Sequence, residues 1–365
     1  MPSNTINGLL ICTGTSEYKN IGDFIQSVAQ EQFFDQIDTY IEREELSSFK
    51  SDKVAKCIMN GWFMQNPDKF PPSDSISPLF ISFHITPRIA EKMLSNKKTI
   101  NYFKAYQPIG VRDYNTKRIL EEKGIESYFT GCLTVCLNKK YKSQTHSDEI
   151  IFVDPYYERP TFKKNIKSFF KQICLFLNHP IAGCKLAHKF HNEFPSSIKK
   201  LSPWLDNAIS ASIFYHTYSK LFEDDVLYNA TYLGHSIPQT LFKNNDDKME
   251  YARKLIKRYA QAKYVITSRI HCALPCLGVE TPVLFVSSEN LESPNGIRSS
   301  GRFDGLIDWL RCLQWTSNGI QIKDEELKRK LSKRKIDSTF IFHNKDTYKT
   351  FRDKMFNIIS NFIKQ

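Results

Sequence analysis

The segment Thr267-Ser-Arg-Ile-His271 combines side chains that can bind an anion with one that can move a proton. It follows an apolar run and opens a helix-like segment that ends near Gly278. A helix start offers free backbone N–H groups, and the guanidinium of Arg269 is a fixed fork suited to a carboxylate or a phosphate. His271 can exchange a proton near neutral pH. We therefore predict a site for a small, multiply charged anion, bound by Ser268 and Arg269; in the alternative, Arg269 pairs with a carboxylate and His271 packs into the lobe.

Two earlier residues also follow apolar runs and could serve the same anion. His84 follows the run Pro78–Phe83, and Arg112 follows an Ile-Gly-Val run. In an open α/β sheet, ligands gather at the carboxyl ends of the strands, so we expect both side chains to reach one cleft. The residues alone leave two alternatives open, a structural role for His84 and a local ion pair between Arg112 and Asp113.

The first passage from strand to helix contains polar residues that could hold a sugar. It lacks a GxGxxG sequence and is too long for a tight dinucleotide turn, which argues against a dinucleotide site. Asp23 and Gln26 share a helix face near Asn20, and we predict that these residues contact sugar hydroxyls. Asp23 as a simple helix N-cap is the alternative.

A second polar segment, Ser287 to Arg302, is rich in Ser, Asn, Gly and Arg. We predict that it closes over the bound anion, with Arg298 and Arg302 as further cations. Solvated surface arginines are the alternative interpretation.

Alternating strand and helix signals must position these residues. Such alternation predicts parallel sheets covered on both faces, and hence an α/β fold. A stretch with almost no apolar content, Asn138–Asp148, divides the chain into a first lobe at 1–145 and a second at 146–330. The predicted strands are Leu9–Cys12, Pro78–Phe83, Glu149–Val153, Ala211–Tyr215, Tyr264–Thr267 and Pro282–Val286.

The remaining segment, 331–365, is predicted to be helical. Phe351, Met355, Ile358 and Phe362 recur at spacings of four, three and four, which puts them on one face of a helix. The pattern favours a helix that returns to pack on the body of the protein. A helix lying on a membrane surface is the alternative.

Composition narrows the class of protein. The formal charge of +12 and a pI near 9.1 attract anions such as phosphorylated substrates, nucleic acid or an anionic membrane. The nine scattered cysteines favour buried thiols in a reducing cytosol over disulfides or a zinc site. No window approaches the roughly 20 apolar residues of a membrane span, and no signal peptide is recognisable. Walker, HExxH and GxSxG motifs are absent, which disfavours ATPases, zincins and α/β hydrolases.

Over most of residues 8 to 310 the chain resembles the polysaccharide pyruvyl transferase family. Three motifs carry the resemblance. They are Asn20-Ile-Gly-Asp23, then Val111-Arg-Asp113 followed by Gly131-Cys-Leu-Thr134, and finally Thr267-Ser-Arg-Ile-His271 followed by Gly278 and Thr281-Pro-Val283.

The resemblance implies two Rossmann-like lobes in a GT-B-like arrangement, with the active site between them. It also implies transfer of pyruvate from phosphoenolpyruvate onto a sugar, as a ketal, during assembly of a cell-surface polysaccharide such as a capsule or exopolysaccharide. Arg269 and His271 correspond to the family's donor site, and we assign His84 and Arg112 to the same site. No resident cofactor or metal is expected, because phosphoenolpyruvate is a co-substrate.

Residue chemistry suits this donor, which carries both a carboxylate and a phosphate. Two arginines would neutralise and orient it. We hypothesise that His271 protonates C3 or assists the departure of phosphate, and that His84 or Asp23 takes the proton of the attacking hydroxyl. The expected acceptor is a lipid-linked oligosaccharide, reached by a cytoplasmic protein that visits the inner face of the membrane.

Two other classes of protein compete with this prediction. A GT-B glycosyltransferase would place a nucleotide sugar at the same helix start. A nucleic-acid-binding protein would need a basic stripe with interleaved aromatic residues, which the sequence lacks.

Overall fold

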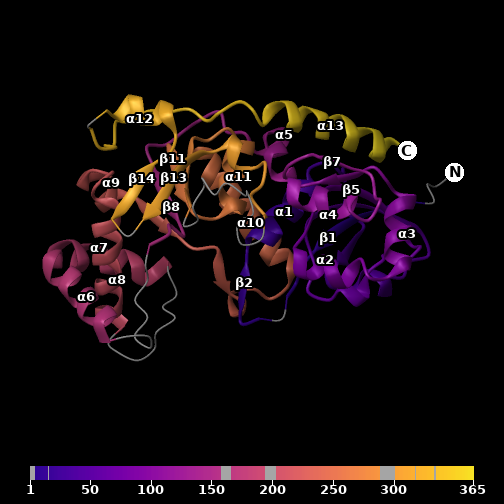
Figure 1. Cartoon of the computed structure of the whole chain (residues 1–365), viewed down its shortest axis with the longest axis horizontal. Helices are drawn as coiled ribbons and strands as arrows, with labels where there is room; N and C mark the ends of the chain where they lie inside the picture. The colour runs from indigo at the N-terminus through magenta and orange to yellow at the C-terminus, as the bar shows by residue number, and fades with distance from the viewer. Residues whose placement is uncertain are drawn as a thin grey trace.

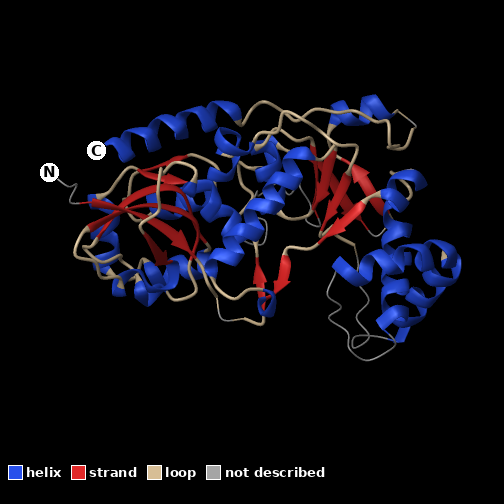
Figure 2. Cartoon of the chain, turned by 180° about the vertical axis from the view of Figure 1, so that it is seen from behind, coloured by secondary structure: helices blue, strands red, loops and turns tan. Residues whose placement is uncertain are grey.

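The computed structural model describes residues 5–14, 16–157, 166–193, 203–287, 301–316, 318–332 and 334–365. Two six-stranded sheets lie side by side with helices packed around them (Figure 1, Figure 2). The predicted α/β class is confirmed. The first sheet lies within residues 1–145 and the second within 146–330.

The first sheet has the strand order β3-β1-β4-β5-β6-β7, and all its pairings are parallel. Its central strands are apolar because helices cover both faces of a parallel sheet, and Leu9, Ile58 and Ile81 are fully buried. The strands are β1 (Thr5–Ile11), β3 (Thr39–Glu42), β4 (Val54–Phe63), β5 (Ile76–Ile85), β6 (Ile109–Val111) and β7 (Ser127–Phe129). The helices are α1 (Gly22–Glu31), α2 (Pro87–Met93), α3 (Lys97–Ala105), α4 (Tyr114–Glu121) and α5 (Asn138–Tyr141).

The second sheet has the order β14-β13-β12-β11-β8-β9, with parallel pairing everywhere except the hairpin β13–β14. Its strands are β8 (Ile150–Val153), β9 (Thr231–Leu233), β11 (Tyr264–Thr267), β12 (Val283–Ser287), β13 (Arg311–Thr316) and β14 (Gly319–Ile322). Its helices include α9 (Asp224–Asn229), α10 (Asn245–Gln261), α11 (Ile270–Gly278) and α12 (Glu325–Leu331).

One predicted strand, Ala211–Tyr215, is wrong. It lies inside helix α8 (Pro203–Tyr218), which belongs to a helical insertion between β8 and β9 together with α6 (Ile166–Asn178) and α7 (Pro180–Glu193). Ala208, Ala211, Ser212 and Phe214 are all buried, so α8 is covered around much of its circumference. A helix buried in this way loses the 3.6-residue alternation of polar and apolar positions, and a short apolar run then reads as a strand.

Several contacts join the lobes, including packing of α1 on α10 and α11 and the two described next. A short antiparallel ribbon pairs β2 (Tyr18–Asn20) of the first lobe with β10 (Ser236–Pro238) of the second, and the Ile21 amide donates to the His235 carbonyl at 2.9 Å. At the other contact, α11 of the second lobe packs on the 3₁₀ helix Leu133–Cys136 of the first.

Gly278 allows α11 to lie close to the 3₁₀ helix Leu133–Cys136. A Cβ atom at this position would lie 2.1 Å from the Thr134 carbonyl oxygen and 3.0 Å from the Val135 Cα. Both neighbours are backbone atoms, so the two elements would have to separate. We expect Gly278→Ala to lower the free energy of unfolding by about 1–3 kcal/mol, the usual cost of overpacking, in a urea denaturation experiment. An unchanged midpoint would contradict this close packing.

The C-terminal helix α13 (Lys349–Lys364) crosses back to the first lobe, as Figure 1 shows. Met355 and Ile359 are buried, and Met355 Sδ lies 3.6 Å from Ser82 Oγ on β5. The Lys56 ammonium donates to the Ile363 carbonyl at 3.1 Å. A returning helix is therefore confirmed, but the helical prediction for all of 331–365 is too long, since the described residues between Leu331 and Lys349 are not helical. The apolar face of α13 is packed against protein instead of facing a membrane. Within the described part of the chain, no helix is long and apolar enough to cross a bilayer.

Candidate active site between the lobes

The turn between β11 and α11 is fixed by Thr267. Its hydroxyl donates to the Val153 carbonyl on β8 (2.8 Å) and accepts from the Arg269 amide (2.9 Å). Since β8 and β11 are neighbouring parallel strands, these bonds fix the turn at their carboxyl edge. Arg269 and His271 thus stand at the start of α11.

Asp154, the residue that follows β8, holds Arg269 in place. Its Oδ2 lies 2.7 Å from Arg269 Nε and accepts from the His235 amide at 3.0 Å. Asp154 has a positive φ of 41°, a conformation that few residues other than glycine adopt but that aspartate tolerates. The carboxylate-paired interpretation of Arg269 is therefore correct for one edge of the guanidinium. Since 47% of the Arg269 side chain stays exposed, the pairing leaves surface for a ligand.

His271 projects from the second lobe into the first. A Cβ atom at Gly22, in the first turn of α1, would lie 2.9 Å from His271 Cβ and 3.1 Å from its Nδ1. On the other side, Arg112 Nη1 lies 3.5 Å from His271 Nε2. An arginine can only donate, so Nε2 accepts and the neutral imidazole carries its proton on Nδ1. The glycine of the early Asn-Ile-Gly-Asp motif thus makes room for this histidine.

Burial lowers the pKa of His271 well below its ordinary value, and the charges of Arg112 and Arg302 lower it further. His271 is consequently neutral at pH 7 in the ligand-free protein. A proton-donating role for this residue needs a bound anion to raise its pKa.

His84 lies at the end of β5 beside a buried carboxylate. Its Nδ1 is 2.6 Å from Asp113 Oδ2, and Asp113 Oδ1 accepts from the Thr116 amide (2.8 Å) to cap α4. Helix α4 therefore begins at Tyr114. Burial and Arg112 lower the pKa of His84 to about 4 despite Asp113. A neutral imidazole whose Nδ1 proton faces a carboxylate presents an unprotonated Nε2, the state required of a general base.

Arg112, at the end of β6, is buried between these two histidines. Its Nε lies 3.7 Å from Asp113 Oδ2, so the local ion pair that the sequence left open does form. The same side chain also reaches His271 of the second lobe. The Arg112 guanidinium therefore makes both the ion pair with Asp113 and the contact with His271 in the cleft.

A cavity of 360 Å³ between the lobes collects most of the predicted residues. His84, Arg112 and Asp23 reach it from the first lobe, and Arg269 and His271 reach it from the second. The residues that line it are Asn20, Asp23, Trp62, His84, Thr86, Arg112, His235, Arg269, Ile270, His271 and Arg302. Of the predicted site residues, only Ser268 and Gln26 do not line this central cavity.

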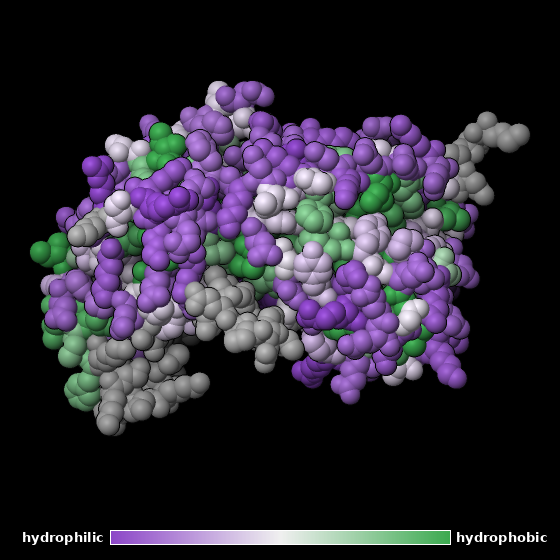
Figure 3. All heavy atoms as spheres, turned by 45° about the horizontal axis from the view of Figure 1, so that its top comes forward, coloured by the Kyte–Doolittle hydropathy of each residue, from purple (hydrophilic) through white to green (hydrophobic). Residues whose placement is uncertain are grey.

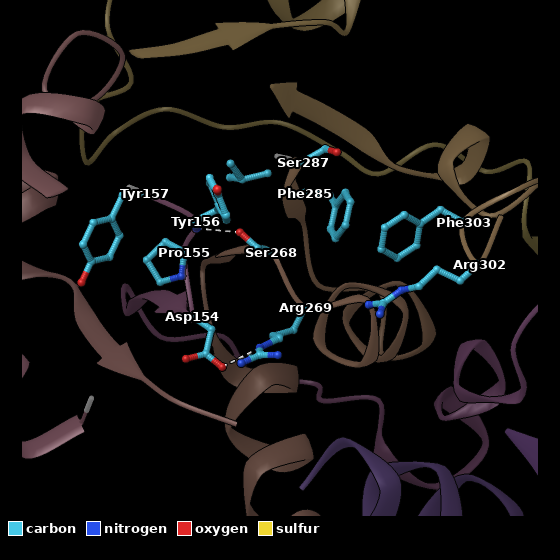
Figure 4. A pocket seen from close by; sticks show the side chains of 11 residues that line it. Asp154, Pro155, Tyr156, Tyr157, Ser268, Arg269, Phe285, Ser287, Arg302 and Phe303 are labelled. Atoms are coloured by element: carbon cyan, nitrogen blue, oxygen red, sulfur yellow. Dashed lines mark hydrogen bonds and ion pairs between the residues drawn. The ribbon is translucent and has the colours of Figure 1, made fainter. Parts of the chain in front are cut away.

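Ser268 instead lines a second cavity of 480 Å³ in the second lobe, at the ends of β8, β11 and β12 (Figure 4). The Ser268 hydroxyl accepts from the Tyr156 amide at 2.6 Å. Arg269 and Arg302 line both cavities, and in Figure 4 the Arg302 side chain extends toward Arg269. The two spaces therefore adjoin at these two arginines. Arg298 and most of the segment predicted to close over the anion lie outside the described residues.

Asp23 is not the N-cap of α1, because that position belongs to Ile21. Its carboxylate instead lies 3.0 Å from Lys19 Nζ and 3.9 Å from Arg43 Nη1. Gln26, one turn later, is buried and donates to the Gly22 carbonyl at 3.4 Å. Asp23 and Gln26 both line a small space beneath the cleft, and of the two only Asp23 also lines the central cavity.

Sequence reasoning missed Asp154 and Trp62, and it considered Asp113 only as an ion-pair partner of Arg112. Asp154 directly follows a predicted strand, so the rule used to find Arg112 could have selected it. Trp62 lies near the end of β4, a strand that was not predicted, and no motif marked it. Its indole ring lies under the Arg43 guanidinium, 5.1 Å from the ring centroid.

Comparisons with known proteins agree with this geometry. A family model described as polysaccharide pyruvyl transferase matches residues 20–290, which is most of the chain. Searches of curated proteins and of solved structures give no match. The matched range begins at Asn20 and includes His84, Arg112, Arg269 and His271. The chain belongs to the polysaccharide pyruvyl transferase family and is a transferase.

Proposed function

We propose that the protein transfers pyruvate from phosphoenolpyruvate to a sugar of a cell-surface polysaccharide precursor, forming a ketal across two hydroxyls. The observation that carries this proposal is the convergence of Arg112, Arg269 and Arg302 with two neutral histidines on one cavity between the lobes. The donor carries about three negative charges. Arginine forks suit its carboxylate and phosphate groups, and the cavity supplies them from both lobes.

The first chemical step is protonation of the donor. Phosphoenolpyruvate beside His271 offsets the charges of Arg112 and Arg302, which favours the imidazolium form. His271 then delivers a proton to the C3 methylene, and positive charge develops at C2. One sugar hydroxyl attacks C2 and gives its proton to His84 Nε2, which Asp113 orients.

The second step closes the ketal. The C2–O bond to phosphate breaks, and the second sugar hydroxyl attacks C2 and loses its proton. The donor's methylene gains one proton, the two hydroxyls lose two, and the departing phosphate takes up the other. Phosphoenolpyruvate with three negative charges thus yields a carboxylate ketal with one and hydrogen phosphate with two. The arginines that held the donor also stabilise the departing phosphate.

The acceptor is assigned to the first-lobe side of the cavity, where Asn20, Asp23 and Trp62 lie. These three residues also line an adjoining space of 380 Å³ with Gln65, so a glycan of more than one sugar has room. The indole offers a flat apolar surface to a sugar ring, and the carboxylate and amides offer partners for its hydroxyls. We propose a lipid-linked oligosaccharide, reached at the inner face of the membrane.

Trp62→Ala should raise the KM for the acceptor by about tenfold, the effect of losing roughly 1.4 kcal/mol of aromatic packing. Trp62→Phe, which keeps a flat ring, should recover much of the loss. Steady-state kinetics at saturating phosphoenolpyruvate measures both variants. An unchanged acceptor KM together with a raised donor KM would place the acceptor elsewhere.

A nucleotide-sugar donor is the competing assignment, and the second-lobe cavity of Figure 4 is the observation that favours it. That cavity combines two arginines with the aromatic residues Tyr156, Phe285 and Phe303. A diphosphate and a base could occupy such a space.

One experiment separates the two donors. The protein is incubated with phosphoenolpyruvate or with nucleotide sugars, in each case with a panel of oligosaccharides, and phosphate release and product mass are followed. Phosphate release with a pyruvyl mass gain supports the proposal. Thermal stabilisation by each donor tests binding without an acceptor, because a ligand of the folded state raises Tm. Stabilisation by a nucleotide sugar but not by phosphoenolpyruvate would overturn the proposal.

A further inference from the structure

Helices α6 and α7 of the helical insertion expose an apolar stripe. Phe170, Leu177 and Ile181 are 61%, 65% and 69% exposed, and Cys174 is exposed as well. Positions 170, 174 and 177 are spaced by four and three residues, which puts them on one face of α6. Ile181 lies in the first turn of α7, directly after the junction at His179, where the His179 amide closes α6 on the Leu175 carbonyl (3.1 Å) and the Gly183 amide opens α7 on the His179 carbonyl (2.9 Å).

This stripe is not the face that holds the insertion together. Gln172 of α6 and Ala182, Leu186 and Ala187 of α7 are buried instead. Trp204, at the start of α8, adds a fourth exposed side chain at 53%. Among the described residues, six large hydrophobic side chains are more than half exposed, and four of them belong to this insertion. In Figure 3, hydrophobic side chains reach the surface at this end of the molecule, whereas most of the view is hydrophilic.

The sequence around α6 and α7 is basic. Between Arg159 and Asn192 the sequence holds no Asp or Glu and seven basic residues: Arg159, Lys163, Lys164, Lys167, Lys171, Lys185 and Lys189. A basic segment with an exposed apolar stripe is typical of helices that lie in the interface of an anionic membrane. A protein partner is less well matched, since lysine is depleted at protein interfaces.

We infer that the apolar stripe of α6 and α7, with Trp204, docks into the surface of an anionic lipid bilayer. Aliphatic and aromatic side chains enter the boundary between headgroups and acyl chains, and the positive charge of the segment's sequence attracts anionic headgroups. The apolar face of α13 is packed against the first lobe, so the insertion and not the C-terminal helix makes the contact.

The insertion belongs to the second lobe. Tyr157 lines the second-lobe cavity, and α6 begins at Ile166. In Figure 1, α6 and α7 lie at the end of the second lobe that faces away from the first lobe, so a bilayer bound to them would lie against the second lobe. Under the proposed function, on which this step rests, docking holds the enzyme at the membrane that contains a lipid-linked acceptor.

Vesicle sedimentation tests the docking itself. The whole protein is mixed with vesicles of phosphatidylcholine alone, or of equal parts phosphatidylcholine and phosphatidylglycerol. We expect binding to the anionic vesicles only. The triple variant Phe170→Ser, Leu177→Ser, Ile181→Ser should bind them at least about tenfold more weakly, because it loses the apolar part of the contact. The control variant Leu241→Ser, Ile341→Ser, altered at two side chains of 68% exposure outside the insertion, should bind as the wild type does.

A label on the stripe gives a readout that does not depend on the triple variant folding. Cys174 and Cys184 are exposed and the other seven cysteines are buried, so Cys184→Ser leaves one accessible thiol. A polarity-sensitive fluorophore on Cys174 should shift to the blue on anionic vesicles and not on neutral ones.

Three results would overturn the inference: no wild-type binding to anionic vesicles, equal binding by the triple variant, or a wild-type dimer that the triple variant converts to a monomer. The dimer would mean that a second copy covers the stripe. Phosphoenolpyruvate-dependent phosphate release with a water-soluble acceptor should be unchanged in the triple variant. If the wild type itself shows no such activity, the proposed function would be wrong, while the vesicle-binding result would still hold.

Discussion

His271→Asn should lower kcat by about 10²- to 10⁴-fold, the usual contribution of general acid catalysis, while phosphoenolpyruvate still binds. Asparagine keeps a polar side chain of smaller size in the space between Gly22 and Arg112 but carries no titratable proton. Donor-induced thermal stabilisation should therefore persist in a protein that barely turns over. Near-normal turnover with normal donor binding would remove His271 from the chemistry.

The pH dependence of the wild type gives this role a second readout. Burial and the neighbouring arginines lower the pKa of His271 in the free protein, whereas a bound trianion raises it. A reaction that needs protonated His271 is lost as pH rises through that pKa. Because kcat/KM reports the free enzyme and kcat the complex, the basic limb of kcat/KM should lie at lower pH than that of kcat. Coincident limbs would show that the donor does not act on this histidine.

Arg112→Met should lower kcat/KM for phosphoenolpyruvate by about 10²- to 10³-fold, the cost of leaving a buried ligand charge without its partner. The buried guanidinium is the first-lobe cation nearest to His271, so its loss affects both donor binding and the proton donor. Arg112→Lys should recover only part of the loss, because an ammonium cannot make the paired hydrogen bonds of a guanidinium.

The same substitution should move the pH profile. Arg112 is the strongest charged contributor to the lowered pKa of His271. Removing it raises that pKa, so the basic limb of kcat/KM should shift to higher pH. Arg118→Met, which removes a half-exposed arginine of α4 paired with Asp304, is the matched control and should leave kinetics and profile unchanged. A lower kcat/KM without a shifted limb would mean that Arg112 does not act on His271, and thermal denaturation would then separate lost donor binding from a destabilised fold.

The fold class followed from the sequence because buried parallel strands are continuous apolar runs. Five of the six predicted runs, at β1, β5, β8, β11 and β12, coincide with interior strands of the two sheets. Edge and antiparallel strands such as β2, β10 and β14 are short and mixed in polarity, so periodicity does not mark them. The prediction of a strand within helix α8 was wrong for the opposite reason. Burial on several sides of this helix removed the alternation of polar and apolar residues that identifies a helix.

Some residues of the candidate site could also be predicted from the sequence, and others could not. Arg112, His84, Arg269 and His271 each follow an apolar run, and a rule about strand ends was enough to group them. Their partners depend on tertiary placement. Nothing in the sequence pairs Asp154 with Arg269 across 115 positions, or places Gly22 against His271. Such contacts arise only when two lobes are set against each other.

The β2–β10 ribbon constrains how the cleft can widen. Three paired residues tie the loop that carries Asn20 to the second lobe, although Asn20 belongs to the first. The Arg112 side of the cavity is tied to the second lobe as well, because the Tyr114 amide at the start of α4 donates to the Asp304 carbonyl at 3.2 Å. Helix α1 also packs on α10 and α11. The cleft therefore cannot widen by rotation about the ribbon alone without breaking these contacts. The edge that carries Asn20 is held from both lobes.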